Sequence, residues 1–231
     1  MSQPTIVFDL DGTLVDTAPD LLDSLNHTLG AGGADKTNGA GFRQFVGHGG
    51  KVMIERAYKA QQRALAPEEH DRLFNLFLEH YGANIPGQSL PYPGVIEALD
   101  RFKDAGYILA VCTNKTEDFS KRLIESLGLH VHFAAICGQD TFAFRKPDPR
   151  HLTETIAKAG GDRHRAVMVG DSRTDIDTAK AAAIPVVAVD FGYTDRHVRE
   201  FEPSRIISHF DELTVQMAND LIASIEGFGR S

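Results

Sequence analysis

The stretch TIVFDLDGT, residues 5–13, decides the fold. Its apolar first half predicts a short buried strand, and two carboxylates, Asp9 and Asp11, follow where that strand should end. A strand places residues i and i+2 on the same side, so a turn at Gly12 lets both acids face one crevice. Ligands of open α/β sheets bind at the carboxyl ends of the strands. The pair is suited to hold a hard cation and to offer one carboxylate as a nucleophile.

These acids have two other possible interpretations. Asp and Gly are common in turns after strands, so the pentapeptide alone is compatible with an ordinary turn. A calcium loop of the EF-hand type needs Gly at its sixth position and Glu at its twelfth. Counted from Asp9, those positions hold Leu14 and Asp20. The calcium loop is therefore excluded, and the turn remains the alternative.

Composition limits the possible partners. The chain has 231 residues, of which 42% are hydrophobic and 24% charged, with a net charge of −8. This balance is typical of a globular protein and argues against binding nucleic acid or an anionic membrane, which require a basic face. No apolar run approaches the roughly 18 residues of a membrane span. We expect a cytoplasmic protein in which Cys112 and Cys137 are reduced and buried.

Alternation of apolar runs and helical patterns predicts an α/β fold with a doubly wound parallel sheet. The expected strands are 5–8, 108–112, 134–137, 166–169, 186–189 and a short sixth at 206–207. The expected helices between them are 95–105, 117–127, 149–159 and 175–182.

The segment between the first two strands differs from the rest, because from about residue 17 to 81 it contains no strand pattern. Leu21, Leu25 and Leu29 repeat at helical spacing, and so do apolar residues near Leu73. A crossover of this length exceeds one helix. We therefore predict two domains, a catalytic α/β core of residues 1–16 and 84–231 and an inserted helical cap of residues 17–83.

Three more segments with polar side chains follow predicted strands. Thr113 and Asn114 suit phosphate oxygens, although, taken alone, they fit the capping of the next helix better. Lys146, between Arg145 and Pro147, could neutralise a phosphoryl group or be an ordinary surface lysine. Each segment is ambiguous by itself, whereas their order along one predicted sheet is not.

A Gly-Asp turn supplies the third of these segments. Asp171 follows Gly170, and Asp175 lies four residues later, where capping of a helix is the alternative role. Mg²⁺ prefers one or two carboxylates together with waters and substrate oxygens. Asp9, the backbone carbonyl of Asp11, and Asp171 would provide such a set.

These motifs, in this order and over nearly the whole chain, resemble the haloacid dehalogenase-like hydrolase superfamily. The resemblance implies that Asp9 attacks phosphorus to form an aspartyl-phosphate and that Asp11 acts as acid and then base. It implies that Thr113, Asn114 and Lys146 hold the phosphoryl oxygens. It also implies a Mg²⁺ site, with Asp171 the stronger ligand candidate and Asp175 binding a metal water or orienting Lys146.

Within the superfamily the chain looks most like the phosphoglycolate phosphatase family. The supporting stretches are residues 9–20, 45–49, 92–95 and 191–193. The likeness implies hydrolysis of 2-phosphoglycolate to glycolate and phosphate, a role in carbohydrate metabolism, and a monomer or homodimer acting on a small phosphorylated metabolite. The substrate's carboxylate should meet a positive group, and we expect Arg43 and His48 of the cap to read it.

Other functions stay open at this point. A phosphomutase of the β-phosphoglucomutase type would use the same core residues but return the phosphoryl group to a sugar. A pyrophosphatase or nucleotide phosphatase of the same superfamily is a second enzyme alternative. A catalytically silent binding or regulatory module is the alternative from a different class, and the intact set of Asp9, Asp11, Lys146 and Asp171 argues against it.

Overall fold

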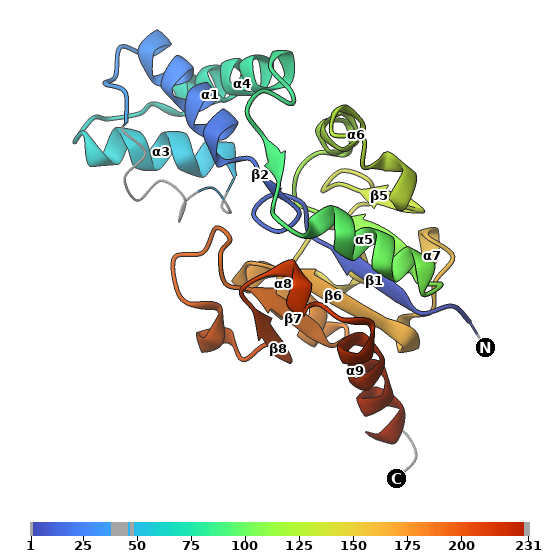
Figure 1. The fold of residues 1–231 in the computed structure, drawn as a ribbon. Coiled ribbons are helices and arrows are strands. Elements are labelled where there is room, and N and C mark those ends of the chain that lie inside the picture. Colours follow the sequence, from blue (N-terminus) through green and yellow to red (C-terminus); the bar gives the residue numbers. More distant parts are fainter. Residues whose placement is uncertain (1, 38–45, 47–48, 229–231) are drawn as a thin grey trace.

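A six-stranded parallel sheet forms the centre of the computed structural model, which describes residues 2–37, 46 and 49–228 (Figure 1). The strand order is β5-β4-β1-β6-β7-β8. The strands are β1 (Thr5–Phe8), β4 (Ile108–Cys112), β5 (Ala135–Cys137), β6 (Ala166–Gly170), β7 (Val186–Val189) and β8 (Arg205–Ile207).

The register of β1 sets the position of the polar segments. Phe8 pairs with Val111 of β4 and with Val169 of β6, all three strands running in parallel. The three strands consequently end at the same edge of the sheet. This is the edge where the segments beginning at Asp9, Thr113 and Asp171 follow.

Helices cover both faces of the sheet. Ile6 and Phe8 of β1 belong to one buried cluster, and Val7 between them belongs to another, as the two-residue period of a strand requires. The first cluster packs against α5 (Val95–Asp104), α6 (Glu117–Ser126) and α9 (Val215–Phe228). The second packs against α7 (Pro149–Lys158) and α8 (Arg173–Ala181). The described residues also form four short 3₁₀ helices: η1 (His130–His132), η2 (Arg163–Arg165), η3 (Val198–Phe201) and η4 (Phe210–Glu212).

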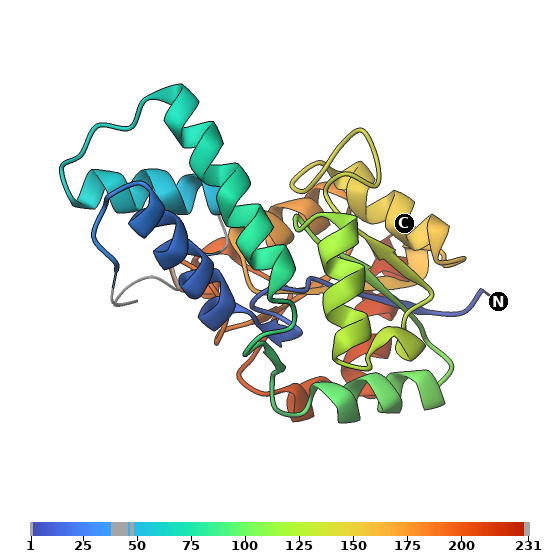
Figure 2. The same ribbon diagram turned by 90° about the horizontal axis from the view of Figure 1, so that it is seen from above.

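A separate helical unit lies beyond the carboxyl ends of the strands, as both ribbon views show (Figures 1 and 2). Its helices are α1 (Ala18–Ala31), α3 (Gly50–Ala60) and α4 (Pro67–Ala83). They share a third buried cluster that includes Leu25, Ile54 and Leu73. Burial of each large aliphatic side chain contributes about 1.5–3 kcal/mol, so the helices stabilise one another through their own core.

Two chain segments connect this unit to the sheet. They pair as the short antiparallel strands β2 (Val15–Asp16) and β3 (Leu90–Pro91). The buried carboxylate of Asp20 in α1 accepts hydrogen bonds from the backbone N–H groups of Gln88 (2.7 Å) and Ser89 (2.8 Å). The connections are therefore tied to each other, which supports our proposal that residues 17–83 form a cap on a core of residues 1–16 and 84–231.

The expected α/β fold with a parallel sheet is confirmed, and each expected strand is present to within a residue. The features that were not expected include α3, α9 and the β2–β3 pair. The pair contains only two residues in each strand, one of them Pro91, so the sequence carries no strand pattern there. Among the described residues, none of the helices combines the length and apolar character needed to cross a bilayer.

Candidate active site

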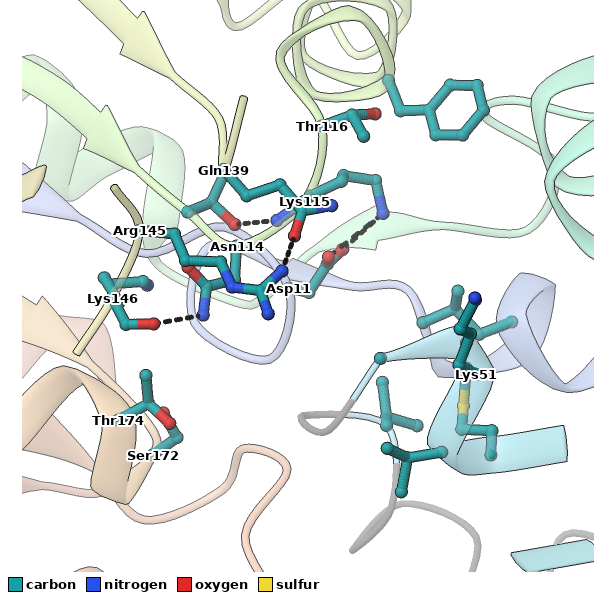
Figure 3. Close-up of a pocket in the computed structure, with 18 of the residues that line it drawn as sticks. Asp11, Lys51, Asn114, Lys115, Thr116, Gln139, Arg145, Lys146, Ser172 and Thr174 are labelled. Carbon is teal, nitrogen blue, oxygen red and sulfur yellow. Dashed lines mark hydrogen bonds and ion pairs between the residues drawn. The ribbon is translucent and has the colours of Figure 1, made fainter. Parts of the chain in front are cut away.

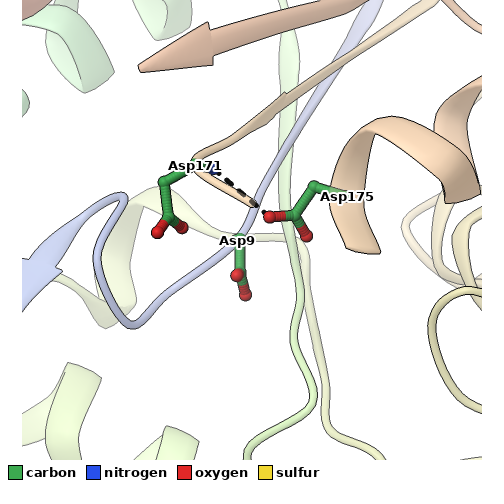
Figure 4. Close-up of side chains that lie close together, drawn as sticks. All are labelled: Asp9, Asp171 and Asp175. Atoms are coloured by element: carbon green, nitrogen blue, oxygen red, sulfur yellow. Dashed lines mark hydrogen bonds between the residues drawn. The ribbon is translucent and has the colours of Figure 1, made fainter. Parts of the chain in front are cut away.

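Three buried carboxylates meet at the carboxyl edge of the sheet (Figure 4). Asp9 follows β1, Asp171 follows β6, and Asp175 lies in the first turn of α8. One oxygen from each lies within 4.8 Å of the others. Since buried acids are rare unless they are paired, this cluster needs positive charge to stabilise it.

Lys146 supplies part of that charge. Its Nζ lies 2.9 Å from Oδ1 of Asp9 and 2.6 Å from Oδ1 of Asp175, and its side chain is 2% exposed. The loop that carries Lys146 is fixed by Asn114, whose Nδ2 donates to the Lys146 carbonyl (2.9 Å). The surface-lysine interpretation of Lys146 is therefore wrong, because its ammonium is buried between two acids.

Asp171 is held in place from two sides. Oδ1 accepts a hydrogen bond from the Thr13 hydroxyl (2.8 Å), and Oδ2 accepts one from the Tyr193 backbone N–H (2.6 Å). A Cβ at Gly12 would lie 2.6 Å from Oδ2 of Asp171, and one at Gly192 would lie 2.2 Å from its Cβ. Only glycine fits at these two approaches, so the surroundings fix the orientation of the carboxylate.

Tyr193 also connects this site to the base of the helical unit. Its hydroxyl donates to Oδ1 of Asp16 (2.6 Å) and accepts from the backbone N–H of Ala18 (2.8 Å). The segment around Tyr193 therefore touches both Asp171 and the chain that leads into α1. Sequence reasoning noted residues 191–193 only as part of the resemblance and did not assign them this contact.

Asp175 fills two roles at once. Its Oδ2 accepts from the N–H and the hydroxyl of Ser172, while the Ser172 hydroxyl accepts from the Asp175 N–H, which together form a capping box at the start of α8. Its Oδ1 remains directed at Lys146. The capping alternative for Asp175 is therefore present, together with the contact to Lys146.

Asp11 lies apart from the three acids. Its carboxylate is 22% exposed and pairs with Lys115, whose Nζ lies 3.0 Å from Oδ1 and 3.1 Å from Oδ2 (Figure 3). Lys115 was not singled out from the sequence, although it lies two residues beyond Thr113 in the same turn. The carboxylate of Asp11 is thus outside the cluster of three acids and meets the same ammonium that lies over the Tyr81 ring of α4.

A cavity of about 760 Å³ connects the acids with the helical unit. The core lines it with Asp9, Thr113, Lys146 and Asp171 among others, and α4 contributes residues that include Tyr81. Val46, Gly49 and Gly50 line it as well. The predicted substrate-reading residues Arg43 and His48 lie outside the described residues.

The pKa values of the cluster report its excess of negative charge. Burial, followed by the charge of Asp175, raises the pKa of Asp9 to about 6 against the opposing effect of Lys146. Burial and the charges of Asp175 and Asp9 likewise raise the pKa of Asp171 well above its ordinary value. Burial lowers the pKa of Lys146, but the charges of Asp175 and Asp9 outweigh this effect and raise the pKa well above its ordinary value. The ammonium therefore stays protonated.

These residues fit a divalent cation. Three carboxylates face one ammonium group, so a dication would balance the charge that remains, and carboxylate oxygens are the ligands that Mg²⁺ prefers. Within the described residues, Asp9 makes its contacts with the Leu10 N–H (2.7 Å) and with Lys146 through Oδ1 alone. Oδ2 of Asp9 therefore takes part in neither of these contacts.

The fold and the site define a class of enzyme. The chain belongs to the haloacid dehalogenase-like hydrolase family, whose model matches residues 6–189. A phosphoglycolate phosphatase from Mesorhizobium japonicum is 75% identical to it over 96% of this chain and 98% of that protein. The chain is accordingly a phosphatase.

Solved structures agree with this assignment. A predicted phosphoglycolate phosphatase from Haemophilus somnus superposes with a TM-score of 0.85 at 30% identity, over 92% of this chain and 97% of that one. A variant of CbbY from Rhodobacter sphaeroides in complex with xylulose 1,5-bisphosphate superposes with a TM-score of 0.75 at 26% identity, over 92% of this chain and 96% of that one.

Proposed function

We propose that this chain is a Mg²⁺-dependent phosphomonoester hydrolase that converts 2-phosphoglycolate and water to glycolate and phosphate through an aspartyl-phosphate. The relative from Mesorhizobium japonicum supports the substrate. The mechanism is supported above all by one observation, the buried contact of Asp9 with Lys146 beside Asp171.

In the first step Oδ2 of Asp9 attacks phosphorus, and the bond from phosphorus to the glycolate oxygen breaks. Asp11 donates a proton to that oxygen as it leaves. In the second step Asp11 takes a proton from water, which attacks the same phosphorus and releases Asp9. Asp11 is exposed to the cavity that the leaving group would use, as this role requires.

The transferring phosphoryl group carries charge that the protein must balance. Lys146 is already placed against Asp9, and we assign it to the phosphoryl oxygens together with Thr113 and Asn114. Mg²⁺, held by Asp9, Asp171 and the backbone carbonyl of Asp11, would offset the repulsion between the Asp9 carboxylate and the phosphate dianion. We assign Asp175 to positioning Lys146, through the 2.6 Å contact between them.

The helical unit completes the site in this proposal. Tyr81 and other residues of α4 form the wall of the cavity opposite the acids. Closure of a cap over the sheet would exclude bulk water while the leaving alcohol departs, which protects the acyl phosphate from premature hydrolysis. The paired connections at β2 and β3 are the expected hinge.

A substrate panel tests the proposal. Phosphate release with Mg²⁺ is measured for 2-phosphoglycolate, xylulose 1,5-bisphosphate, β-glucose 1-phosphate, pyrophosphate, a nucleoside monophosphate and p-nitrophenyl phosphate. We expect kcat/KM for 2-phosphoglycolate to exceed the others by about a hundredfold, equivalent to about 2.7 kcal/mol of transition-state discrimination. A flat profile would refute the substrate assignment, and loss of activity without Mg²⁺ is expected for every substrate.

A further inference from the structure

Lys115 has an unusual position for a lysine. It lies in the turn after β4, yet its side chain is only 6% exposed. Its Nζ contacts both oxygens of Asp11, and it lies 4.3 Å from the centre of the Tyr81 ring of α4. Figure 3 shows its side chain extended toward the carboxylate of Asp11. The ammonium thus sits between the proposed acid of the core and the wall supplied by the helical unit.

Among the described residues, the other basic side chains that line the cavity either pair with acids away from Asp11 or are exposed to solvent. Lys146 is used by Asp9 and Asp175. Lys51 is half exposed and pairs with Asp71 at 2.6 Å. Arg145 is exposed and donates to Gln139 (3.0 Å). Among these basic residues, Lys115 is the one whose buried ammonium contacts Asp11 directly.

The shape of 2-phosphoglycolate brings its carboxylate close to the leaving oxygen. One methylene separates the two groups, so at ordinary bond lengths the carboxylate oxygens lie about 2.6–3.6 Å from the ester oxygen. The acid that protonates the ester oxygen must lie within hydrogen-bond reach of it. A cation that touches this acid is therefore within reach of the carboxylate.

We propose that Lys115 binds the carboxylate of the substrate while it remains in contact with Asp11. The inference rests on the proposed function and names the residue that determines specificity within it. An ammonium has three N–H donors, enough for both carboxylates. Lys115 selects short phosphomonoesters that carry an anionic group one methylene from the ester oxygen, and Tyr81 closes the apolar side of this subsite.

A matched pair of substrates tests this role. Ethyl phosphate has the same leaving chain as 2-phosphoglycolate, with a methyl group in place of the carboxylate. The ratio of kcat/KM for 2-phosphoglycolate to that for ethyl phosphate is measured in wild type and in Lys115→Met. We expect the ratio to fall about 30-fold, which is about 2 kcal/mol at 1.36 kcal/mol per tenfold. Any effect of Lys115 on Asp11 itself changes both substrates and cancels.

Two further variants serve as controls. Lys121→Met removes an exposed lysine that pairs with Glu117 on α6, and it should leave the ratio unchanged. Lys115→Arg keeps the charge and should recover part of the preference. Since binding needs no turnover, the affinities of 3-phosphonopropionate and propylphosphonate, compared by calorimetry, give the same ratio even if Lys115→Met is inactive.

The outcomes distinguish failure of the Lys115 subsite from failure of the proposed substrate. In one outcome the wild type prefers 2-phosphoglycolate, and Lys115→Met keeps both the kcat/KM ratio and the affinity ratio of the wild type. This result overturns the role of Lys115 and leaves the proposed function intact. In that case the carboxylate is read elsewhere, and Arg43 and His48 are the next residues to change. A wild type with no preference for 2-phosphoglycolate over ethyl phosphate refutes the proposed substrate and the subsite together.

Discussion

Oδ1 of Asp175 accepts a hydrogen bond of 2.6 Å from Nζ of Lys146, a residue 29 positions earlier in the chain. Both side chains are buried, and the same ammonium reaches Asp9 at 2.9 Å. One lysine thus joins the proposed nucleophile to a residue that also caps a helix. The contact fixes the Lys146 ammonium beside Asp9, where our proposal places the phosphoryl group.

Asp175→Asn should lower kcat because it keeps the shape of the side chain but removes the charge that positions Lys146. We expect a loss of about a hundredfold in phosphate release, or about 2.7 kcal/mol of activation free energy. Asp177→Asn is the matched control, since Asp177 is exposed and pairs with Arg173 on the surface. Equal rates for the two variants would contradict the positioning role.

Gly192→Ala should weaken Mg²⁺ binding by displacing Asp171. The added Cβ would lie 2.2 Å from the Cβ of Asp171, closer than unbonded carbon atoms approach. In a Mg²⁺ titration of phosphate release we expect the apparent Kd to rise at least about tenfold, since metal sites tolerate little displacement of their ligands.

Gly30→Ala is the control for this substitution. Gly30 lies in α1 with open space around it, so the change should leave the Mg²⁺ titration unaltered. It should also raise the free energy of unfolding by up to about 1 kcal/mol, because alanine is the better helix former. If Gly192→Ala titrates like wild type, Asp171 does not hold the metal.

His151 makes stability depend on pH. It is fully buried, its Nδ1 accepts from the Lys146 N–H (3.2 Å), and its Nε2 contacts the Gly138 carbonyl (3.1 Å). Burial and the charge of Lys146 lower its pKa from 6.5 to about 4. Between these values the unfolded chain binds a proton that the folded chain does not, so stability present above pH 6.5 is lost as the pH falls.

We therefore expect wild type to lose about 2 kcal/mol more than His151→Gln between about pH 7 and about pH 5. The measurement is the free energy of unfolding by denaturant at both pH values, and the difference between the two proteins removes the contributions of all other groups. Parallel pH profiles would show that His151 does not titrate in this range.

Much of the fold was predictable because buried parallel strands are short apolar runs. The run of residues 186–189 became β7 without any shift, and the motifs that begin at Asp9, Thr113 and Asp171 directly follow strands. Lys146 does not, because it lies in the loop between the end of β5 at Cys137 and the start of α7 at Pro149. By contrast, α3 begins at Gly50 without a side-chain cap, so its start carries no local signal. Partners such as Asp11 and Lys115, which are 104 positions apart, are brought together only by the strand order.

Some residues of the site were likewise predictable from the sequence, and others were not. Asp9, Lys146, Asp171 and Asp175 were named from local motifs, and the structure brings them together. Their roles in catalysis remain predictions. Tyr193 supports Asp171 through its backbone N–H, which any residue type except proline could donate, so no side-chain pattern could reveal it.

Trapping of the covalent intermediate tests the central claim, that Asp9 is the nucleophile. Wild type is mixed with Mg²⁺ and 2-phosphoglycolate labelled in its phosphate, quenched with acid during turnover, digested and analysed by mass spectrometry. The account predicts a hydroxylamine-labile phosphate on Asp9, and neither label nor turnover in Asp9→Asn. A turning-over wild type with no label on Asp9, or an Asp9→Asn variant that still releases phosphate at the wild-type rate, would contradict it.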